Sequence, residues 1–487
     1  MAIERIELAP GLSISRVVTG LWQIADMERG GRTLDLDAAA RAMHPYIDAG
    51  FTSFDMADHY GSAELIAGRA RPHESEGGQH VQLFTKWVPP PGPVTAADVR
   101  AAVERSLTRL RVPAIDLLQF HAWNYADPFW LDALFHLQDL QREGLIRHLG
   151  LTNVDAAHLR LVLASGIPIV SNQVSASLVD RRAAGPLAAV CQEFDVSLLA
   201  YGTLCGGWLS DRWLGAAEPD WERQGTWSQM KYGRFIRVAG GWPALQRVLR
   251  AARVVADRHG VSIANVATRF VLQQPGVAAV IVGARLGERE HIDDNRRLGR
   301  LVLDEDDRLQ LEAAIATLTP IPGDCGDEYR TPPYLTASGD LTHHLDGFPA
   351  PYQVRESGDG SRRCFSGTEW EPMSGFCRAV RRGRRIHVSG TTATHGSRML
   401  GGADPAAQTH AAIDRIAGAL QSLGARLEDV VRTRIYVSSL DHWEPVARAH
   451  GERFRAIQPA NTLVEARIVG GEYLVEIEAE AEVSKDL

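Results

Sequence analysis

The first 300 residues alternate short apolar runs with segments of helical periodicity, and this alternation restricts the fold more than any other feature of the sequence. Eight runs are predicted to be buried strands: Val17–Leu21, Thr52–Asp55, Val81–Lys86, Ile115–Phe120, Arg147–Leu151, Ile169–Gln173, Ser197–Tyr201 and Ala278–Val282. Strands that alternate with helices form βαβ units and a parallel sheet. Eight such units in about 300 residues predict an α/β fold, a closed (β/α)8 TIM barrel. An open doubly wound sheet is the alternative.

Two stretches interrupt the alternation. From Gly202 to Trp242 the sequence has several tryptophans and no helical period, which predicts a long functional loop. From Thr319 to Pro351 it is rich in Pro, Gly, Asp and Thr, a composition typical of a linker between domains. The chain is therefore expected to divide into a barrel at 1–318, a Pro-rich linker at 319–351 and a second domain at 352–487.

The pattern changes after the linker. Strands are predicted at Arg385–Ser389, Val430–Val437, Thr462–Ile468 and Tyr473–Val483, and helices at Ala406–Leu423 and His442–Phe454. In the last strand apolar residues alternate strictly with glutamates, so one face is expected to be buried and the other solvated. This pattern predicts a small α+β domain.

Composition is that of an ordinary globular protein, with 487 residues, 45% of them hydrophobic and 23% charged. A net charge of −8 and the lack of a Lys/Arg block argue against nucleic-acid binding. No run approaches the roughly 18 apolar residues of a membrane helix, and no metal site is expected. The five cysteines are odd in number and lack C-x-x-C spacing, which favours reduced thiols in the cytoplasm.

Polar residues follow three neighbouring predicted strands. Asp55 ends the second strand and Tyr60 comes five residues later, Lys86 ends the third strand, and His121 follows the fourth. In a (β/α)8 barrel the active site lies at the carboxyl ends of the strands, so these groups are expected to share one pocket. A tyrosine can protonate a carbonyl oxygen, an ammonium lowers the pKa of that tyrosine, and a carboxylate holds the ammonium in place. A histidine can orient the carbonyl.

At these residues the sequence resembles the aldo-keto reductase superfamily. The matching pieces are Asp55-x4-Tyr60-Gly61, Phe84-Thr85-Lys86, and His121 directly after Asp116-Leu117-Leu118-Gln119-Phe120. Later segments match in order up to Ile281-Val282-Gly283-Ala284-Arg285, so the resemblance covers about residues 4–318. It implies that Tyr60 is the proton donor, that Lys86 and Asp55 tune it, and that His121 positions a small carbonyl or alcohol substrate.

The same resemblance implies a barrel that binds NADP(H), or less often NAD(H), without a Gly-rich Rossmann turn, and no such turn follows a predicted strand. Asn153 and Gln173 are expected to hold the nicotinamide carboxamide, Tyr201 to stack on the ring, and Arg285 to meet the 2′-phosphate. The other implied cofactor residues are Thr152, Gly202, Leu204, Gly283 and Asn295. The candidates for the wall of the substrate pocket are Trp22, Trp87 and Trp123.

Residues from about 352 to 484 resemble the Rid (YjgF-like) family of small trimeric enamine/imine deaminases, which implies a chorismate-mutase-like α+β fold and a homotrimer. The resemblance rests on segments that include His387-Val388-Ser389-Gly390-Thr391 and Gln458-Pro459-Ala460-Asn461-Thr462. The deaminases carry an arginine that binds the substrate carboxylate where this chain has Asn461, whereas the glutamate expected fifteen residues later is present as Glu476. Deamination of amino-acid-derived enamines is therefore not expected from a pocket at Asn461 and Glu476.

Three functions remain open at this point. The leading one is an NAD(P)(H)-dependent oxidoreductase that reduces an aldehyde or ketone, or oxidises the alcohol, fused to a trimerising or ligand-binding Rid-like domain. The alternative is a bifunctional enzyme whose Rid-like domain hydrolyses an imine or enamine and whose barrel reduces the carbonyl product. The third is a non-catalytic cofactor sensor or assembly protein, against which the set Asp55, Tyr60, Lys86 and His121 argues for the barrel.

Overall fold

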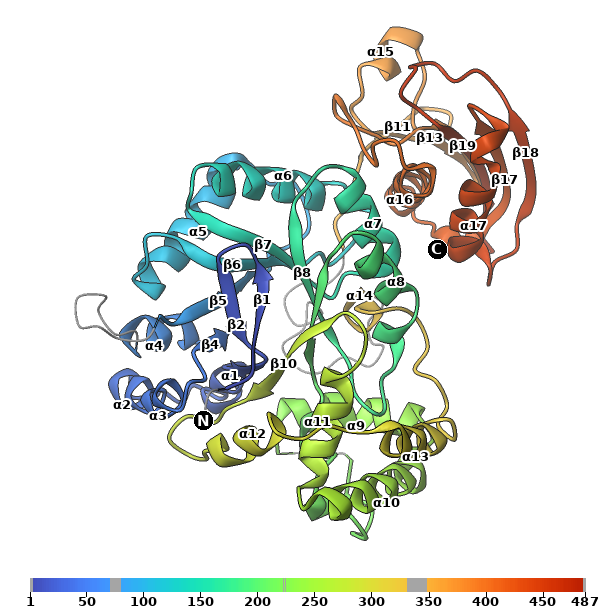
Figure 1. Cartoon of the computed structure of the whole chain (residues 1–487). Coiled ribbons are helices and arrows are strands. Elements are labelled where there is room, and N and C mark those ends of the chain that lie inside the picture. Colours follow the sequence, from blue (N-terminus) through green and yellow to red (C-terminus); the bar gives the residue numbers. More distant parts are fainter. Residues whose placement is uncertain (1–2, 71–79, 222, 224, 331–347, 485–487) are drawn as a thin grey trace.

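The protein is described from a computed structural model, which covers residues 3–70, 80–221, 223, 225–330 and 348–484. Eight parallel strands form a closed barrel in the order β10-β3-β4-β5-β6-β7-β8-β9 (Figure 1). Their bounds are β3 Val17–Gly20, β4 Ser53–Asp55, β5 Gln82–Trp87, β6 Ile115–Phe120, β7 Ile146–Thr152, β8 Ile169–Ser175, β9 Ser197–Tyr201 and β10 Val277–Gly283. The predicted TIM barrel is confirmed, and the pairing of β10 with β3 excludes the open sheet.

An N-terminal hairpin closes the amino end of the barrel. Its strands, β1 Arg5–Ala9 and β2 Leu12–Ser15, bury Leu12 and Ile14. These side chains form one core cluster with Phe84, Leu117 and Leu199 from the barrel strands. Because apolar side chains fill this end, the opposite end, where the strands finish, is left for the functional site.

Helices surround the barrel. They are α1 Gln23–Met27, α2 Leu36–Arg41, α3 His44–Asp48, α4 Ala63–Ala70, α5 Ala96–Leu110, α6 Phe129–Arg142, α7 Ala156–Ala164, α8 Pro186–Glu193, α10 Gly241–His259, α11 Ile263–Leu272, α12 Ile292–Leu298 and α13 Glu305–Ile315. Local sequence sets their ends: Thr95 and Asp98 form a capping box at the start of α5, and Gly260 ends α10 in the left-handed conformation.

The 202–242 stretch is more ordered than its sequence indicates. It contains the helix α9 Trp227–Val238, whose N-cap is Thr226, so the prediction of a loop without helix was wrong for this part. Trp208 lies fully buried and makes ring contacts with Trp213, Trp221 and Trp242. These tryptophans therefore stabilise the stretch as a small core of their own on the barrel.

The first part of the predicted linker packs on the barrel. Residues 319–330 include the short helix α14 Asp327–Arg330, in which Glu328 is fully buried and accepts a hydrogen bond from Arg182 at 2.9 Å. Residues 331–347 lie outside the described part of the chain. The division of the chain at 319–351 stays a prediction, but residues up to Arg330 contact the barrel.

The second domain is a sheet of seven strands covered on one face by two helices. The order is β11-β12-β13-β14-β19-β17-β18. The bounds are β11 Gln353–Glu356, β12 Arg362–Phe365, β13 Ala379–Arg382, β14 Arg385–Thr391, β17 Val430–Val437, β18 Ala460–Glu465, β19 Val475–Glu482, α16 Pro405–Ser422 and α17 Trp443–Phe454. A short helix, α15 Trp370–Ser374, and a small ribbon, β15 Thr394–His395 with β16 Arg398–Met399, complete it.

The two domains meet where α16 packs against α7 (Figure 1). Gly418 of α16 allows this approach, since a Cβ there would lie 2.4 Å from the backbone oxygen of Ala126 in the barrel. At the centre of the contact, His158 of α7 lies between Asp155, at 2.6 Å, and Asp414 of α16, at 3.0 Å. The interface therefore combines close helix packing with buried charge.

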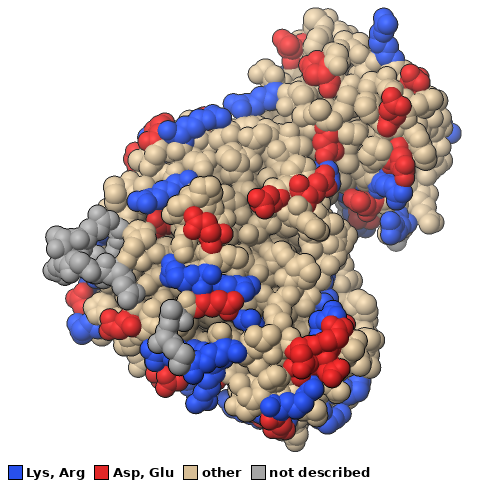
Figure 2. Space-filling model, in the orientation of Figure 1, with Lys and Arg blue, Asp and Glu red and all other residues tan. Residues whose placement is uncertain are grey.

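The surface shows no segregation of charge on the face drawn in Figure 2, where positive and negative side chains are interspersed over both domains. Among the described residues, no helix is long and apolar enough to cross a membrane. All five cysteines are free thiols.

Candidate active site

The ends of β4 and β5 bring a buried ion pair to the carboxyl end of the barrel. Lys86 Nζ donates to Asp55 Oδ2 at 2.6 Å and to the backbone oxygen of Met56 at 2.9 Å. Both charged side chains are about 95% buried. The ammonium also lies 4.9 Å from the ring centroid of Tyr60, which follows β4. The structure thus brings the acid candidate and its predicted partners together.

Two glutamines that face the barrel interior hold the Asp55 carboxylate from the other side. Gln119 Nε2 donates to Asp55 Oδ1 at 3.0 Å, and Gln173 Nε2 donates to the same oxygen at 2.7 Å. Gln173 Nε2 also lies 2.8 Å from Gln119 Oε1. Asp55 therefore accepts hydrogen bonds from three side chains, which fix the position of its carboxylate. The sequence alone did not single out Gln119, although it lies within the matching motif Asp116-Leu117-Leu118-Gln119-Phe120 on β6, two strands from Asp55.

Burial shifts both titrating groups beside Asp55. It raises the pKa of Tyr60 well above its usual value, and the Asp55 carboxylate adds to the shift. The expectation that Lys86 lowers the pKa of Tyr60 is corrected here, because desolvation of a buried phenolate outweighs attraction to an ammonium that Asp55 already neutralises. Burial also lowers the pKa of Lys86, opposed by Asp55.

His121 is buried and neutral. Burial lowers its pKa well below the usual value, and the charge of Arg330 adds to this. Nδ1 lies 3.2 Å from the backbone oxygen of Thr152, and Nε2 is buried without a hydrogen-bond partner among the described residues. The neutral ring has one N–H and thus two tautomers. With the proton on Nδ1 it donates a hydrogen bond to the backbone oxygen of Thr152, and with the proton on Nε2 it can donate one to a ligand oxygen.

The tetrad opens into a cavity of about 390 Å³. The lining includes most of the predicted residues, namely Trp22, Asp55, Tyr60, Lys86, His121, Trp123, Thr152, Asn153, Gln173, Tyr201, Gly202, Leu204, Gly283 and Arg285. Two predicted residues lie outside the lining. Trp87 packs against Phe120 in the core, and Asn295 is buried on α12, so neither has its expected place in the cavity wall.

The structure adds residues that the sequence analysis did not single out. Lys231 and Tyr232 of α9 and Tyr329 of α14 line the catalytic side of the cavity, and Asp26 lines the side of Arg285. Lys231 and Tyr329 come from the stretches interpreted as loop and linker. No local pattern marks them, because only the docking of α9 and α14 brings them to the cavity.

The cavity wall fits a nicotinamide dinucleotide. Asn153 adopts a left-handed conformation at φ 58° and accepts a hydrogen bond from Tyr201 Oη at 2.6 Å, which fixes an amide beside an aromatic ring. Farther along, Gly202 has φ 75°, and a Cβ there would lie 2.1 Å from Tyr232 Oη, so only glycine fits. Arg285 provides a cation near this end, bonded to Asp26 at 2.9 Å and Glu288 at 2.7 Å.

The predicted Rid-like pocket does not form within one chain. Asn461 is paired in register with Thr433 on the helix-covered side of the sheet and donates to its Oγ1 at 2.9 Å. Glu476 is paired with Tyr436, three positions along β17, and lies against Gly390 on the other face. Since successive strand residues point to opposite faces, Asn461 and Glu476 do not meet in a single chain. A pocket that uses both residues therefore stays a prediction.

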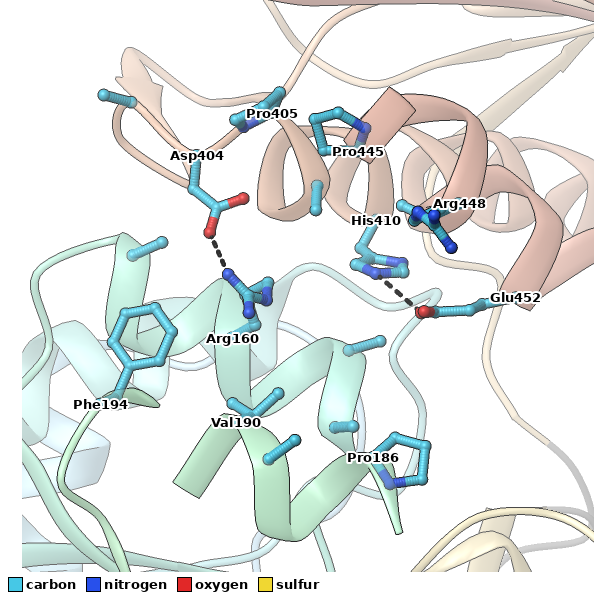
Figure 3. Close-up of a pocket in the computed structure, with 17 residues that line it drawn as sticks. Arg160, Pro186, Val190, Phe194, Asp404, Pro405, His410, Pro445, Arg448 and Glu452 are labelled. Atoms are coloured by element: carbon cyan, nitrogen blue, oxygen red, sulfur yellow. Dashed lines mark hydrogen bonds and ion pairs between the residues drawn. The ribbon is translucent and has the colours of Figure 1, made fainter. Parts of the chain in front are cut away.

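A second hollow lies between the domains (Figure 3). It measures about 740 Å³ and is walled by α7 and α8 on one side and by α16 and α17 on the other. Arg160 donates to Asp404 at 2.6 Å, and His410 Nε2 lies 3.4 Å from Glu452. These charged side chains are thus paired with one another. The hollow does not include Asp55, Tyr60, Lys86 or His121.

Comparison with known proteins agrees with this architecture. The family model described as "Aldo/keto reductase family" matches residues 16–316, and the model described as "Endoribonuclease L-PSP" matches residues 367–483. The protein tas of Escherichia coli is 32% identical over 249 residues, which are 47% of this chain and 69% of that protein. The uncharacterised protein SCO2049 of Streptomyces coelicolor is 38% identical over 121 residues, which are 25% of this chain and 90% of that protein.

Among solved structures, a glycerol dehydrogenase of Gluconobacter oxydans has a TM-score of 0.54 and 25% identity, over 66% of this chain and 98% of that one. The closed barrel, the buried polar set at its carboxyl end and the match over residues 16–316 lead to one assignment. The chain belongs to the aldo/keto reductase family of nicotinamide-dependent oxidoreductases and carries a Rid/YjgF-like domain after the barrel.

Proposed function

We propose that the protein is an NADP(H)-dependent carbonyl reductase in which Tyr60 protonates the substrate oxygen. The observation that carries this proposal is the convergence of Asp55, Tyr60, Lys86 and His121 on one cavity whose wall also fits a nicotinamide. When bound, the nicotinamide supplies a hydride to the carbonyl carbon. The carbonyl oxygen then needs a proton, and of the tyrosines that line the cavity Tyr60 is the one beside Lys86 and Asp55.

The raised pKa of Tyr60 keeps its phenol protonated at neutral pH, so the donor is in the required form before substrate binds. Loss of the proton leaves a phenolate near Lys86, and the ammonium stabilises that charge. Asp55 holds the ammonium at 2.6 Å and opposes the lowering of the Lys86 pKa by burial. His121 positions the carbonyl through Nε2, in the tautomer that carries the proton there and gives up a hydrogen bond from Nδ1 to the backbone oxygen of Thr152.

The residues that would hold the cofactor follow from the cavity wall. Of the residues that line the cavity, Asn153 and Gln173 would hold the carboxamide and Tyr201 would stack on the ring. Thr152, Gly202, Leu204 and Gly283 would contact the rest of the dinucleotide. Arg285, which lines the cavity, would meet the 2′-phosphate of NADP(H), and this expected contact is the reason to prefer NADP(H) over NAD(H). The functional barrel extends through Arg330, because Arg330 Nη2 donates to the backbone oxygen of Asn153 at 2.5 Å.

The Rid-like domain is proposed to act as a trimerising or ligand-binding module. The separation of Asn461 and Glu476 within one chain gives no support to imine hydrolysis by this domain. The five free thiols fit a reducing compartment, and we place the protein in the cytoplasm.

The test is a screen of aldehydes and ketones with NADPH and NADH, run on the full-length protein and its Tyr60→Phe variant. We expect kcat to fall at least about 10²-fold in the variant, because Phe has no proton to give. The Kd for NADPH, followed by tryptophan fluorescence, is expected to stay unchanged. Tyr46→Phe removes a buried phenol outside the cavity and serves as the control. Near-normal turnover by Tyr60→Phe would refute the assignment.

A further inference from the structure

A second lysine, tyrosine and carboxylate set lies in the wall of the catalytic cavity. Lys231 Nζ donates to Tyr329 Oη at 2.6 Å and lies 3.7 Å from Glu328 Oε1. It also lies 3.5 Å from Tyr201 Oη. Lys231 and Tyr329 line the cavity, whereas Glu328 is fully buried behind them and also bonded to Arg182.

Lys231 keeps its charge. Burial alone would lower its pKa, but the Glu328 carboxylate and the hydrogen bond to Tyr329 oppose burial, and the pKa is raised. The other cations of the lining are Lys86, Arg285 and Arg289. Lys86 and Arg285 are bonded to Asp55 and Asp26, carboxylates that line the same cavity, and Arg289 is exposed to solvent. The carboxylate that neutralises Lys231 is that of Glu328, which lies outside the lining. An anion in the cavity can therefore approach the Lys231 ammonium from the side opposite to Glu328.

The hydrogen bonds around Tyr329 leave its hydroxyl proton available for a ligand. An ammonium only donates, so Tyr329 Oη accepts from Lys231 and its own proton points elsewhere. Tyr201 Oη lies 3.3 Å away and donates its proton to Asn153 Oδ1 at 2.6 Å. The Tyr329 proton is thus shared with Tyr201 at this longer distance or donated into the cavity, next to a fixed positive charge.

This donor stands beside the substrate end of the tetrad. The ring of Tyr329 meets His121 edge-on, with centroids 5.5 Å apart, and Trp123 at 6.2 Å. A substrate whose carbonyl is held by His121 therefore has its neighbouring atoms within reach of Tyr329. A negatively charged oxygen there accepts the phenol proton and is attracted by Lys231.

We propose that Lys231 and Tyr329 form an anion subsite, and that the preferred substrates are aldehydes or ketones that carry a carboxylate a few bonds from the carbonyl carbon. The inference rests on the proposed carbonyl reduction and deepens it by naming the substrate class. In this assignment Tyr329 contacts the carboxylate, and Lys231 supplies the charge.

The test compares 4-oxobutanoate with its neutral methyl ester, which have the same aldehyde. For the wild type we expect kcat/KM for the acid to exceed that for the ester by about tenfold or more, the value of a charge-assisted hydrogen bond. In Lys231→Met the acid-to-ester ratio is expected to fall to near one, and in Tyr329→Phe to fall partway. Arg237→Met removes an exposed cation from the same helix and is expected to keep the wild-type ratio.

The variant should remain folded, since Glu328 keeps its bond to Arg182 when Lys231 is replaced, and a melting curve checks this. A ratio near one in the wild type, with good reduction of the ester, overturns the inference and leaves the proposed function intact. A lowered affinity of Lys231→Met for NADPH with an unchanged ratio also overturns it, because Lys231 then serves a cofactor phosphate. Failure of the wild type to reduce either substrate, or any other carbonyl in the screen, refutes both proposals.

Discussion

At the scale of single residues, the expected binding of the 2′-phosphate by Arg285 competes with the ion pairs that this arginine makes in the structure. Its guanidinium bonds Asp26 on one side and Glu288 on the other, and 28% of its side chain is exposed. A 2′-phosphate must therefore displace Glu288, which is the more exposed partner. If Arg285 has the proposed role, the preference for NADP(H) over NAD(H) depends on the free energy of this exchange.

Arg285→Ala is expected to raise the Kd for NADPH by about tenfold or more, the value of one charge-assisted hydrogen bond, and to change the Kd for NADH far less. Glu288→Gln is expected to act in the opposite direction, because it frees the guanidinium. Arg296→Ala on α12 removes an exposed cation outside the cavity and is the control. Fluorescence titration measures all three, and equal effects on both cofactors would show that Arg285 does not read the phosphate.

At the scale of elements, the contact of α7 with α16 depends on a buried histidine. His158 stacks on Tyr125 at a centroid distance of 3.4 Å and lies between Asp155 and Asp414. Asp414 is also bonded by Arg453 at 2.7 Å. Burial opposes the charge of His158, but the two carboxylates outweigh it and raise the pKa. The contact is thus a charged network within an apolar interface.

The pKa of His158 is higher in the folded protein than in the unfolded chain, where it is about 6.5. Its charge therefore contributes its full stabilisation below about pH 6.5, and this contribution is lost as the pH rises through the pKa of the folded state. The pKa of Asp414 is lowered, so its contribution is lost only as the pH falls below about 4. His158→Asn is expected to cost about 3 kcal/mol at pH 6, as for a broken buried pair. Melting curves should show the difference from wild type shrinking toward pH 9, with the exposed His44→Asn as control. A difference that grows with pH would contradict the charged state.

At the scale of the whole molecule, the open face of the Rid-like sheet is where further copies are expected to bind. The helices α16 and α17 cover one face, and α16 also contacts the barrel. The other face carries the half-buried glutamates of β19, with Arg434 bonded to Glu478 at 3.1 Å and Glu480 at 3.0 Å. The barrels therefore lie on the helix side and leave the sheet side accessible.

We expect the full-length protein to form a trimer of about 160 kDa, three times the 53.3 kDa chain. Light scattering measures this mass directly. A matched chain that ends after Arg330 is expected to be monomeric, and it keeps Tyr329 and Arg330 in the cavity wall. A monomeric full-length protein, or a trimeric shortened chain, would remove the scaffold role of the second domain.

Sequence alone determined the barrel and the tetrad. Strand and helix periodicity reports burial along a few neighbouring residues, so all eight barrel strands were predicted. Parallel strands of a barrel end at the same edge. The sequence therefore also predicted that Asp55, Lys86 and His121, which lie at the ends of three adjacent strands, share one site. Three strands of the seven-stranded sheet, β11, β12 and β13, and the short ribbon strands β15 and β16 were missed. The strands β11 and β12 have only four residues each, at least half of them polar, so they show little apolar alternation.

Only the tertiary structure decided which distant segments meet. Lys231 and Tyr329 lie 98 residues apart and join one cavity because α9 and α14 dock on the same end of the barrel. Asn461 and Glu476 lie on one sheet yet on opposite faces, which strand register sets. Burial then raised the pKa of Tyr60, against the expectation from charge alone. Each of these outcomes depends on packing between segments far apart in the chain. Local sequence periodicity reports only whether nearby residues are buried, so it cannot predict such packing.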